Sequence, residues 1–183
     1  MSRFFLRVSF YMIAHLLSVH LCGQERVPGK SEKDGWAIQI GGGIMYGGNI
    51  GLLTERQIFL KQKFRFTPFF STGIGEAGTD SITSTRHYWL GYAAGLNLEY
   101  GIKHRIFIGP HFEGNSVLGR SDHFKKTYFS GIGTIIGYKG TSRIGLIWLV
   151  YIGNFYSPDD DPFSADKSYD HRSQFGLGLG YKF

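Results

Sequence analysis

The sequence has little cysteine, no long apolar segment outside its N-terminus and no cluster of basic residues. Its single cysteine, Cys22, excludes a framework of intramolecular disulfides. A mean hydropathy of -0.12 excludes a polytopic helical membrane protein, because each such helix needs about 20 apolar residues. The net charge is +6, but no Lys/Arg cluster with interleaved aromatic residues is present, so we expect no nucleic-acid partner.

Glycine and aromatic residues are abundant instead, with 27 Gly, 16 Phe and 11 Tyr. Glycine is at about twice its usual share of ~7%. Hydrophobic residues make up 42% of the chain, which is enough for one core and excludes a disordered protein. This composition favours a single all-β domain.

The N-terminus has the pattern of a secretory signal peptide at residues 1–23. Arg3 and Arg7 form a short basic region, and the apolar segment 8–22 follows it. We expect cleavage after Gly23, which leaves a short polar segment at 24–34. A lipoprotein acylated on Cys22 is the alternative, and it is disfavoured because Leu21 stands where a small residue is usual.

The rest of the chain alternates apolar with small or polar residues, and this period of two indicates strands. In the clearest segment, 87–100, Leu90, Leu96 and Leu98 share one face while Gly91, Gly95 and Glu99 share the other. The alternation predicts strands at 36–46, 50–60, 64–74, 87–100, 105–113, 126–138, 142–156 and 174–183. The segment 50–60 is the least secure, because Glu55 and Arg56 put charges on both faces, and a count of seven strands stays open.

Short connectors alternate with long polar ones along the chain, at 101–104 and 139–141 against 75–85, 117–125 and 157–168. Tight turns at one rim and long loops at the other are typical of a transmembrane barrel. We therefore predict an eight-stranded antiparallel up-and-down transmembrane β-barrel at 35–183. Pro68 and Pro110 fall within strand patterns, so we expect each at a bulge or at a rim.

The charged faces of the strands are expected to point into the barrel. An Arg such as Arg105 facing lipid at the midplane would cost about 2–4 kcal/mol. The alternative is a soluble lipocalin-like barrel, but its solvent face would then be Gly91, Ala93 and Gly95, which is unusually small and apolar. Inward charges in so narrow a lumen must pair, so we expect a network that plugs the barrel, with a narrow pore as the alternative. The expected lumenal residues are Arg65, Glu99, Arg105, His111, Glu113, Arg143, Arg172 and Lys182.

The last strand ends the chain on an aromatic residue and carries alternating apolar positions, namely Phe175, Leu177, Leu179, Tyr181 and Phe183. It resembles the C-terminal signal by which bacterial outer-membrane barrels are recognised by the barrel-assembly machinery. With the signal peptide, the chain resembles the small outer-membrane β-barrel proteins of Bacteroidota, and is similar in size to the OmpA-type barrel domain. The resemblance implies a Gram-negative outer membrane and lipid contact, and it implies no shared catalytic residues.

No catalytic, cofactor or metal site is predicted. The segment 73–78 matches the G-x-G-x-x-G pattern, but no helix follows it, so we interpret it as a flexible outer loop. The histidines lack close metal-ligand spacing. The acidic residues 159–161 are interpreted as a solvated loop rather than a calcium site.

A lipid A deacylase-like enzyme is the remaining alternative, through the fragment 111–116. Glu113 stands where the nucleophilic serine of that pattern would be, and His111 is expected to face away from lipid. We therefore predict a non-enzymatic barrel that acts as a scaffold, adhesion or accessory component. Its long loops are expected to meet an extracellular protein or a polysaccharide.

Overall fold

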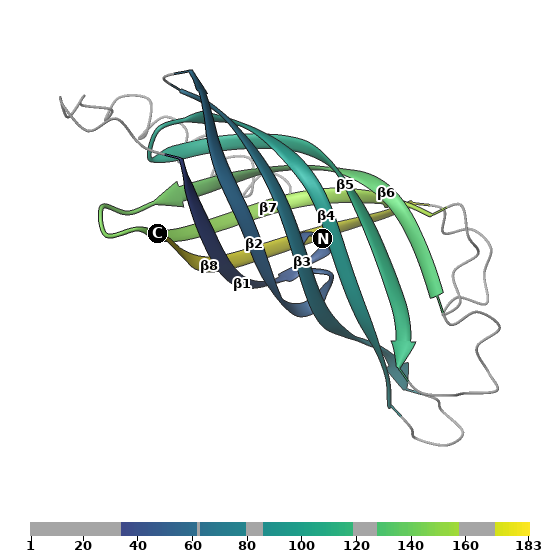
Figure 1. Ribbon diagram of the computed structural model, residues 1–183. Coiled ribbons are helices and arrows are strands. Elements are labelled where there is room, and N and C mark those ends of the chain that lie inside the picture. The colour runs from purple at the N-terminus through teal and green to yellow at the C-terminus, as the bar shows by residue number, and fades with distance from the viewer. Residues whose placement is uncertain (1–33, 62, 80–85, 119–127, 158–170) are drawn as a thin grey trace, which may run out of the picture. The chain divides into compact units, whose positions relative to one another are not determined.

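The computed structural model describes residues 34–61, 63–79, 86–118, 128–157 and 171–183 (Figure 1). The expected signal peptide and the acidic segment 159–161 lie outside these ranges. The described residues form eight strands and one short 3-10 helix. Their bounds are β1 Gly35–Gly43, η1 Ile44–Tyr46, β2 Gly48–Lys61, β3 Phe64–Thr79, β4 Arg86–Gly101, β5 His104–Leu118, β6 Tyr128–Thr141, β7 Leu146–Tyr156 and β8 His171–Lys182. Within the described ranges, no helix is long and apolar enough to cross a membrane.

The strands form a closed barrel in which each pairs antiparallel with its neighbours in sequence. The barrel closes between β1 and β8, where Ala37 pairs with Lys182 and Gly42 with Leu177. The prediction of an eight-stranded barrel is confirmed, and its least secure element, 50–60, lies in β2. Each strand pairs with two neighbours over part or all of its length, which is how a barrel in hydrocarbon satisfies its backbone.

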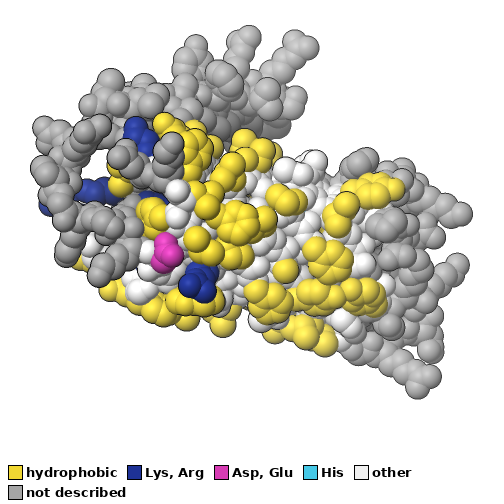
Figure 2. All heavy atoms as spheres, turned by 45° about the horizontal axis from the view of Figure 1, so that its top comes forward, with side chains coloured by type: hydrophobic (Ala, Val, Ile, Leu, Met, Phe, Trp, Pro, Cys, Tyr) yellow, Lys and Arg dark blue, Asp and Glu magenta, His cyan; other side chains and the backbone are white. Residues whose placement is uncertain are grey.

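The alternating pattern places apolar side chains on the outside of the wall. In β7, for example, Val150 and Ile152 are exposed while Leu149 and Tyr151 are buried in the lumen. Hydrophobic side chains cover much of the wall seen in Figure 2, and the described charged side chains visible there lie toward the end that carries the short turns. Leu, Ile and Phe on an outer wall match a hydrocarbon environment and would be costly in water.

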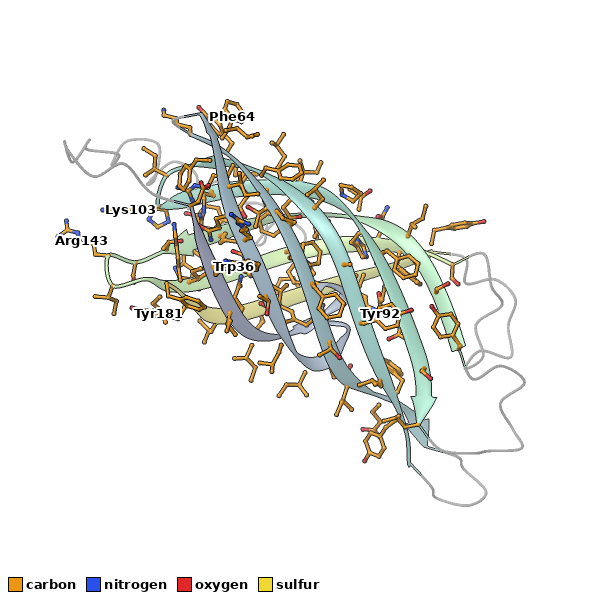
Figure 3. The ribbon with its side chains drawn as sticks, viewed as in Figure 1. Trp36, Phe64, Tyr92, Lys103, Arg143 and Tyr181 are labelled. Atoms are coloured by element: carbon orange, nitrogen blue, oxygen red, sulfur yellow. The ribbon has the colours of Figure 1, made fainter. Side chains whose placement is uncertain are left out.

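Aromatic side chains lie on the outer face near both ends of the strands, and Trp36, Phe64, Tyr92 and Tyr181 are labelled in Figure 3. Near the short turns, the rings of Phe64 and Tyr100 are 5.0 Å apart. Toward the other end, the hydroxyl groups of Tyr92 and Tyr128 are 2.6 Å apart. Two belts of aromatic residues that flank an apolar band are typical of transmembrane barrels.

The two prolines do not lie where the sequence predicts. Pro68 pairs with Leu96, and Pro110 with Thr134, inside ladders that show no bulge at either position. The register on the other side of Pro68 also continues unchanged, as Glu55↔Phe69 and Ile58↔Phe66 show. Each proline therefore gives up a ladder hydrogen bond without shifting the register, so the expectation of a bulge or rim was wrong.

The connection between β1 and β2 is short and folds into the barrel. The segment 36–46 was expected to be one strand, but β1 ends at Gly43, whose φ of 107° only glycine adopts readily. Ile44, Met45 and Tyr46 then form η1, and all three side chains are fully buried. Gly47, with φ 67°, lies so close to the backbone of Gly91 that a Cβ there would clash.

The glycine-rich segment 73–78 was also interpreted wrongly. It was expected to be a flexible outer loop, but β3 runs without interruption to Thr79, with a bulge between Glu76 and Gly78. The glycines serve packing here, because a Cβ at Gly75 would meet the ring of Trp89.

The outward face can be tested at Ile152, which is 56% exposed and lies four residues from both Trp148 and Tyr156 in β7. We expect Ile152→Arg to lower the free energy of unfolding in lipid vesicles by about 2–4 kcal/mol, because the charge lies near the bilayer midplane. Ile144→Arg, in the β6–β7 turn, is the matched control and should change it by about 0–1 kcal/mol. Denaturant titration measures both, and equal effects would contradict the assigned faces.

Candidate functional site

The lumen near the short turns contains a closed ring of polar side chains. Five fully or almost fully buried residues from four strands form it: Glu55 and Gln57 of β2, Glu99 of β4, Arg105 of β5 and Lys139 of β6. These strands lie on different sides of the barrel, so the ring spans its interior.

Lys139 is the centre of this ring. Its Nζ donates to Glu55 Oε2 at 2.7 Å, to Glu55 Oε1 at 3.0 Å and to Glu99 Oε1 at 2.5 Å. Arg105 Nε lies 3.3 Å from Glu99 Oε2. Gln57 closes the ring, because it accepts from Arg105 at 3.1 Å and donates to Glu55 Oε1 at 2.9 Å. Arg105 also donates to the hydroxyl of Thr141 at 2.6 Å.

The ring balances two carboxylates against two cations. An unpaired ion in such a dry interior would cost several kcal/mol, whereas a charge with opposite partners and hydrogen bonds is tolerated. The amide of Gln57 fits because one side chain both donates and accepts. The ring is therefore built to hold charge without a bound ion.

A further cation, Arg65, lies beside the ring at the same end of the barrel. It is fully buried, donates to the carbonyl oxygen of Ile102 at 3.0 Å, and its guanidinium lies 4.4 Å from the centre of the Phe59 ring. The Nζ of Lys182 lies 5.4 Å from the centre of the same aromatic ring. Phe59 therefore contacts both cations by its π system.

An apolar layer fills the lumen next to the ring. Lys139 Nζ lies 5.5 Å from the centre of the Phe107 side chain, which belongs to this layer. The strand pattern predicts a lumen of charges and small residues, and this apolar cluster was not predicted. Its members come from η1 and six strands: Ile44, Met45, Tyr46, Leu53, Phe69, Ala93, Phe107, Ile135, Leu149, Tyr151 and Phe155.

Tyr151 fixes η1 in this layer by two hydrogen bonds. Its hydroxyl donates to the carbonyl oxygen of Gly42 at 3.2 Å and accepts from the backbone N–H of Met45 at 2.9 Å. The hydroxyl of Tyr46 donates to Gln39 Oε1 at 3.3 Å. The inward turn is thus held as a part of the lumen filling.

Beyond the apolar layer lie His111, Glu113 and Asn115 of β5, all buried. Asn115 Nδ2 donates to Glu113 Oε1 at 2.8 Å, and the ring of His111 lies 6.5 Å from that of Phe155. Among the residues that the structure describes, no group of three or more His, Cys, Asp or Glu side chains is arranged to hold a metal.

The structure places five of the eight expected lumenal residues inside the barrel: Arg65, Glu99, Arg105, His111 and Glu113. Only Glu99 and Arg105 of these contact each other in the ring. Lys182 is half-buried at the rim, and the side chain of Arg172 lies outside what the structure describes.

Arg143 was expected to point inward, and this expectation was wrong. The strand was expected to begin at residue 142, but β7 begins at Leu146, and Arg143 is exposed in the turn before it (Figure 3). Gly145, with φ 90°, and the hydrogen bond from Leu146 N–H to the Ser142 hydroxyl define this turn.

Glu55, Gln57 and Lys139 were missed as site residues. Lys139 was assigned to a turn at 139–141, although β6 continues to Thr141. The signal for Glu55 was present, because it shares a face of β2 with Leu53 and Gln57. Its neighbour Arg56 masked this signal, but Arg56 faces outward and lies 5.7 Å from the Trp36 ring.

The five C-terminal positions of the expected assembly signal all face outward. Phe175, Leu177, Leu179, Tyr181 and Phe183 are between 53% and 66% exposed. Their backbone closes the barrel, since Trp36 and Phe183 exchange two hydrogen bonds of 3.2 and 3.0 Å. Recognition by an assembly machinery stays a prediction.

No protein-family model and no curated protein sequence matches the chain. Among solved structures, it is similar to Ail, the attachment invasion locus protein of Yersinia pestis, in complex with the heparin analogue sucrose octasulfate (12% identity, TM-score 0.46, 82% of this chain and 95% of that chain). It is also similar to a major outer membrane protein from Thermus thermophilus (14% identity, TM-score 0.48, 83% and 100%). A third match is Ail in a phospholipid bilayer nanodisc (14% identity, TM-score 0.45, 82% and 100%). The small eight-stranded barrel of this chain resembles these outer-membrane proteins in fold.

The ring predicts how charge removal affects stability. Lys139→Met should lower the free energy of unfolding by about 3–5 kcal/mol, because Glu55 then loses its Lys139 partner and Glu99 keeps only Arg105 within the ring. Adding Glu55→Gln restores the balance of charge and should recover most of this loss.

Denaturant unfolding of the protein in lipid vesicles, followed by tryptophan fluorescence, measures both variants. If the double variant is as unstable as Lys139→Met, charge balance does not stabilise the ring.

Proposed function

We propose that this chain is a non-enzymatic barrel of the bacterial outer membrane whose lumen is closed, and that it acts as a scaffold, adhesion or accessory component. The single observation that carries the proposal is the filled lumen. A barrel that conducts nothing through its interior presents only its outer wall and its loops to other molecules.

Two layers of different chemistry support a closed lumen. The ring of Glu55, Gln57, Glu99, Arg105 and Lys139 crosses the interior with its donors and acceptors directed at one another. The eleven buried apolar side chains next to it interrupt any continuous polar path. Eight strands give a narrow bore, and the buried side chains of both layers support a closed lumen rather than a water-filled channel.

The outer wall supports residence in a membrane. It presents apolar residues along every strand and aromatic belts near both ends. The expected signal peptide and the outward-facing C-terminal positions are consistent with export and insertion by a barrel-assembly machinery into outer-membrane lipid. Such a protein needs no cofactor for this role.

The lipid A deacylase-like alternative has little support in the geometry. His111 lies inside the lumen beside Phe155, and the neighbouring acid Glu113 is also buried, so neither faces a lipid substrate. The partners that fit the proposal are an extracellular protein or a polysaccharide, reached through the long connections between strands.

Conductance across planar lipid bilayers tests the proposal. The purified protein should give no steady channels, and Glu99→Gln should give none either, because the apolar layer remains. An open porin in the same bilayer is the positive control. Steady channels in the wild type that vanish in Glu99→Gln would show a polar pore instead of a plug.

Mass spectrometry of lipid A distinguishes the scaffold proposal from the enzyme alternative. Cells with and without the protein should contain the same lipid A species. A change in acylation that depends on His111 would replace the scaffold proposal with an enzyme.

A further inference from the structure

The β1–β2 hairpin is shorter than the wall around it. The last β1 partner of β8 is Gly42, paired with Leu177, so residues 171–176 of β8 extend beyond β1. On the other side, β3 continues to Thr79, beyond the pair Ile50↔Ile74. Figure 1 shows that β1 and β2 join well before the far ends of β3–β6. The wall therefore has a lateral notch, bounded by the turn of the hairpin and by one edge each of β3 and β8.

A hollow of about 700 Å³ occupies this notch. That volume is within the ~300–1,000 Å³ of small-molecule sites. It runs from the outer β1–β8 seam, at Ile40 and Leu179, to residues whose side chains face the lumen, Trp89 and Glu113. The rings of Tyr46 and Tyr151 lie against Gly178 and Gly176, where a Cβ would clash, so glycines let the two rings close its inner floor.

The notch lies at membrane depth. Residues 173–176 of β8 lie five to eight residues from Tyr181 of the belt near the short turns. At ~3.3 Å per residue and a strand tilt of about 40°, this is ~13–20 Å from that belt. The apolar band of a transmembrane barrel is ~25 Å tall, so this edge runs from its centre, where Phe175 pairs with Ile152, toward the leaflet on the side of the long connections.

The lining of the notch combines polar and apolar residues. Gln174, Asn49 and Glu113 supply polar groups, and Phe175, Leu177 and Leu179 of β8 supply exposed apolar side chains. A membrane lipid combines the same two chemistries, with hydroxyl, amide or ester groups joined to a hydrocarbon chain.

The edge of β8 favours a polar occupant. Backbone N–H and C=O groups in hydrocarbon cost several kcal/mol each unless they form hydrogen bonds, and open sheet edges do not face lipid tails. Within the described residues, no strand pairs with this edge of β8 beyond Leu177. Ester, amide and hydroxyl groups of a lipid can bond such an edge, whereas a hydrocarbon chain alone cannot.

We propose that the notch binds one lipid of the adjacent leaflet, with its polar linkage at the β8 edge near Gln174 and Glu113 and one acyl chain along the β1–β8 seam. The inference rests on the proposed membrane location. It adds a bound ligand to a barrel otherwise treated as a scaffold, and it gives the short hairpin a role in ligand binding.

Native mass spectrometry of the full-length protein, released gently from its own membrane, tests the proposal. We expect one retained lipid on the wild type and its loss in Asn49→Phe, which fills the notch from an exposed position. Ile132→Phe is the matched control, because Ile132 is 63% exposed on β6, away from the notch, and it should retain the lipid.

Tryptophan fluorescence gives an independent readout. In a Trp36→Phe, Trp148→Phe background, Trp89 is the only tryptophan, and it lines the hollow from the inner side of the wall. Lipids brominated near the ester end of the chain should quench Trp89, and Asn49→Phe should reduce this quenching. A variant that keeps only the outward-facing Trp148 is the positive control for contact with brominated lipid.

Three results would overturn the proposal. They are equal lipid retention in Asn49→Phe and Ile132→Phe, quenching of Trp89 by an aqueous quencher but not by brominated lipid, and an added mass that corresponds to a peptide strand. A faster gel mobility of the unboiled protein shows that the barrel has folded. This control distinguishes two outcomes. In one, the barrel folds but the lipid site is lost, and in the other, the membrane assignment itself fails.

Discussion

The pairing of Lys139 with Glu55 and Glu99 is the interaction on which the interior depends. A wall that faces hydrocarbon must turn its ionisable side chains inward, and inward charges in a bore this narrow have no bulk water to solvate them. The two carboxylates therefore need the two cations, Lys139 and Arg105, and the amide of Gln57 completes the hydrogen bonds. The apolar outer wall and the lumenal ring both follow from the hydrocarbon environment, because the same strands supply the outer and the inner face.

The short β1–β2 hairpin has two effects that belong together. Ending β1 at Gly43 directs Ile44, Met45 and Tyr46 into the lumen, where they join the apolar layer. Among the described strands, the same ending leaves β3 and β8 each without a partner on the side of the hairpin beyond it. The residues of η1 therefore lie in the lumen next to the part of the wall that the short hairpin leaves lower. Tyr151 links the end of β1 to η1, because its hydroxyl bonds both Gly42 and Met45. A longer hairpin would complete the wall but would remove η1 from the interior.

The strands and their faces were predictable because a period of two is a local signal. Leu98, Glu99 and Tyr100 show their orientation in sequence alone, and the structure confirms it. The outward position of Arg143 was not predictable. Next to an apolar segment, the sequence of a four-residue turn cannot be told from four more residues of strand. Only the hydrogen bonds of Ser142 and Gly145 decide where β7 begins. The prediction of a bulge or rim at the two prolines was wrong because it used a local rule alone. A long ladder keeps its register across one missing donor, so Pro68 and Pro110 need no bulge.

The sequence by itself determined the barrel, the outward apolar face and the inward position of Arg65, Glu99, Arg105, His111 and Glu113, because each follows from alternation along a single strand. Only the tertiary structure decided which of these charges meet. Glu55 and Lys139 are 84 residues apart in the chain, and their contact depends on the register of every ladder between them. The inward turn at η1 and the notch beside it likewise depend on where neighbouring strands end, which is a relation between strands and is not encoded in the pattern of any one of them.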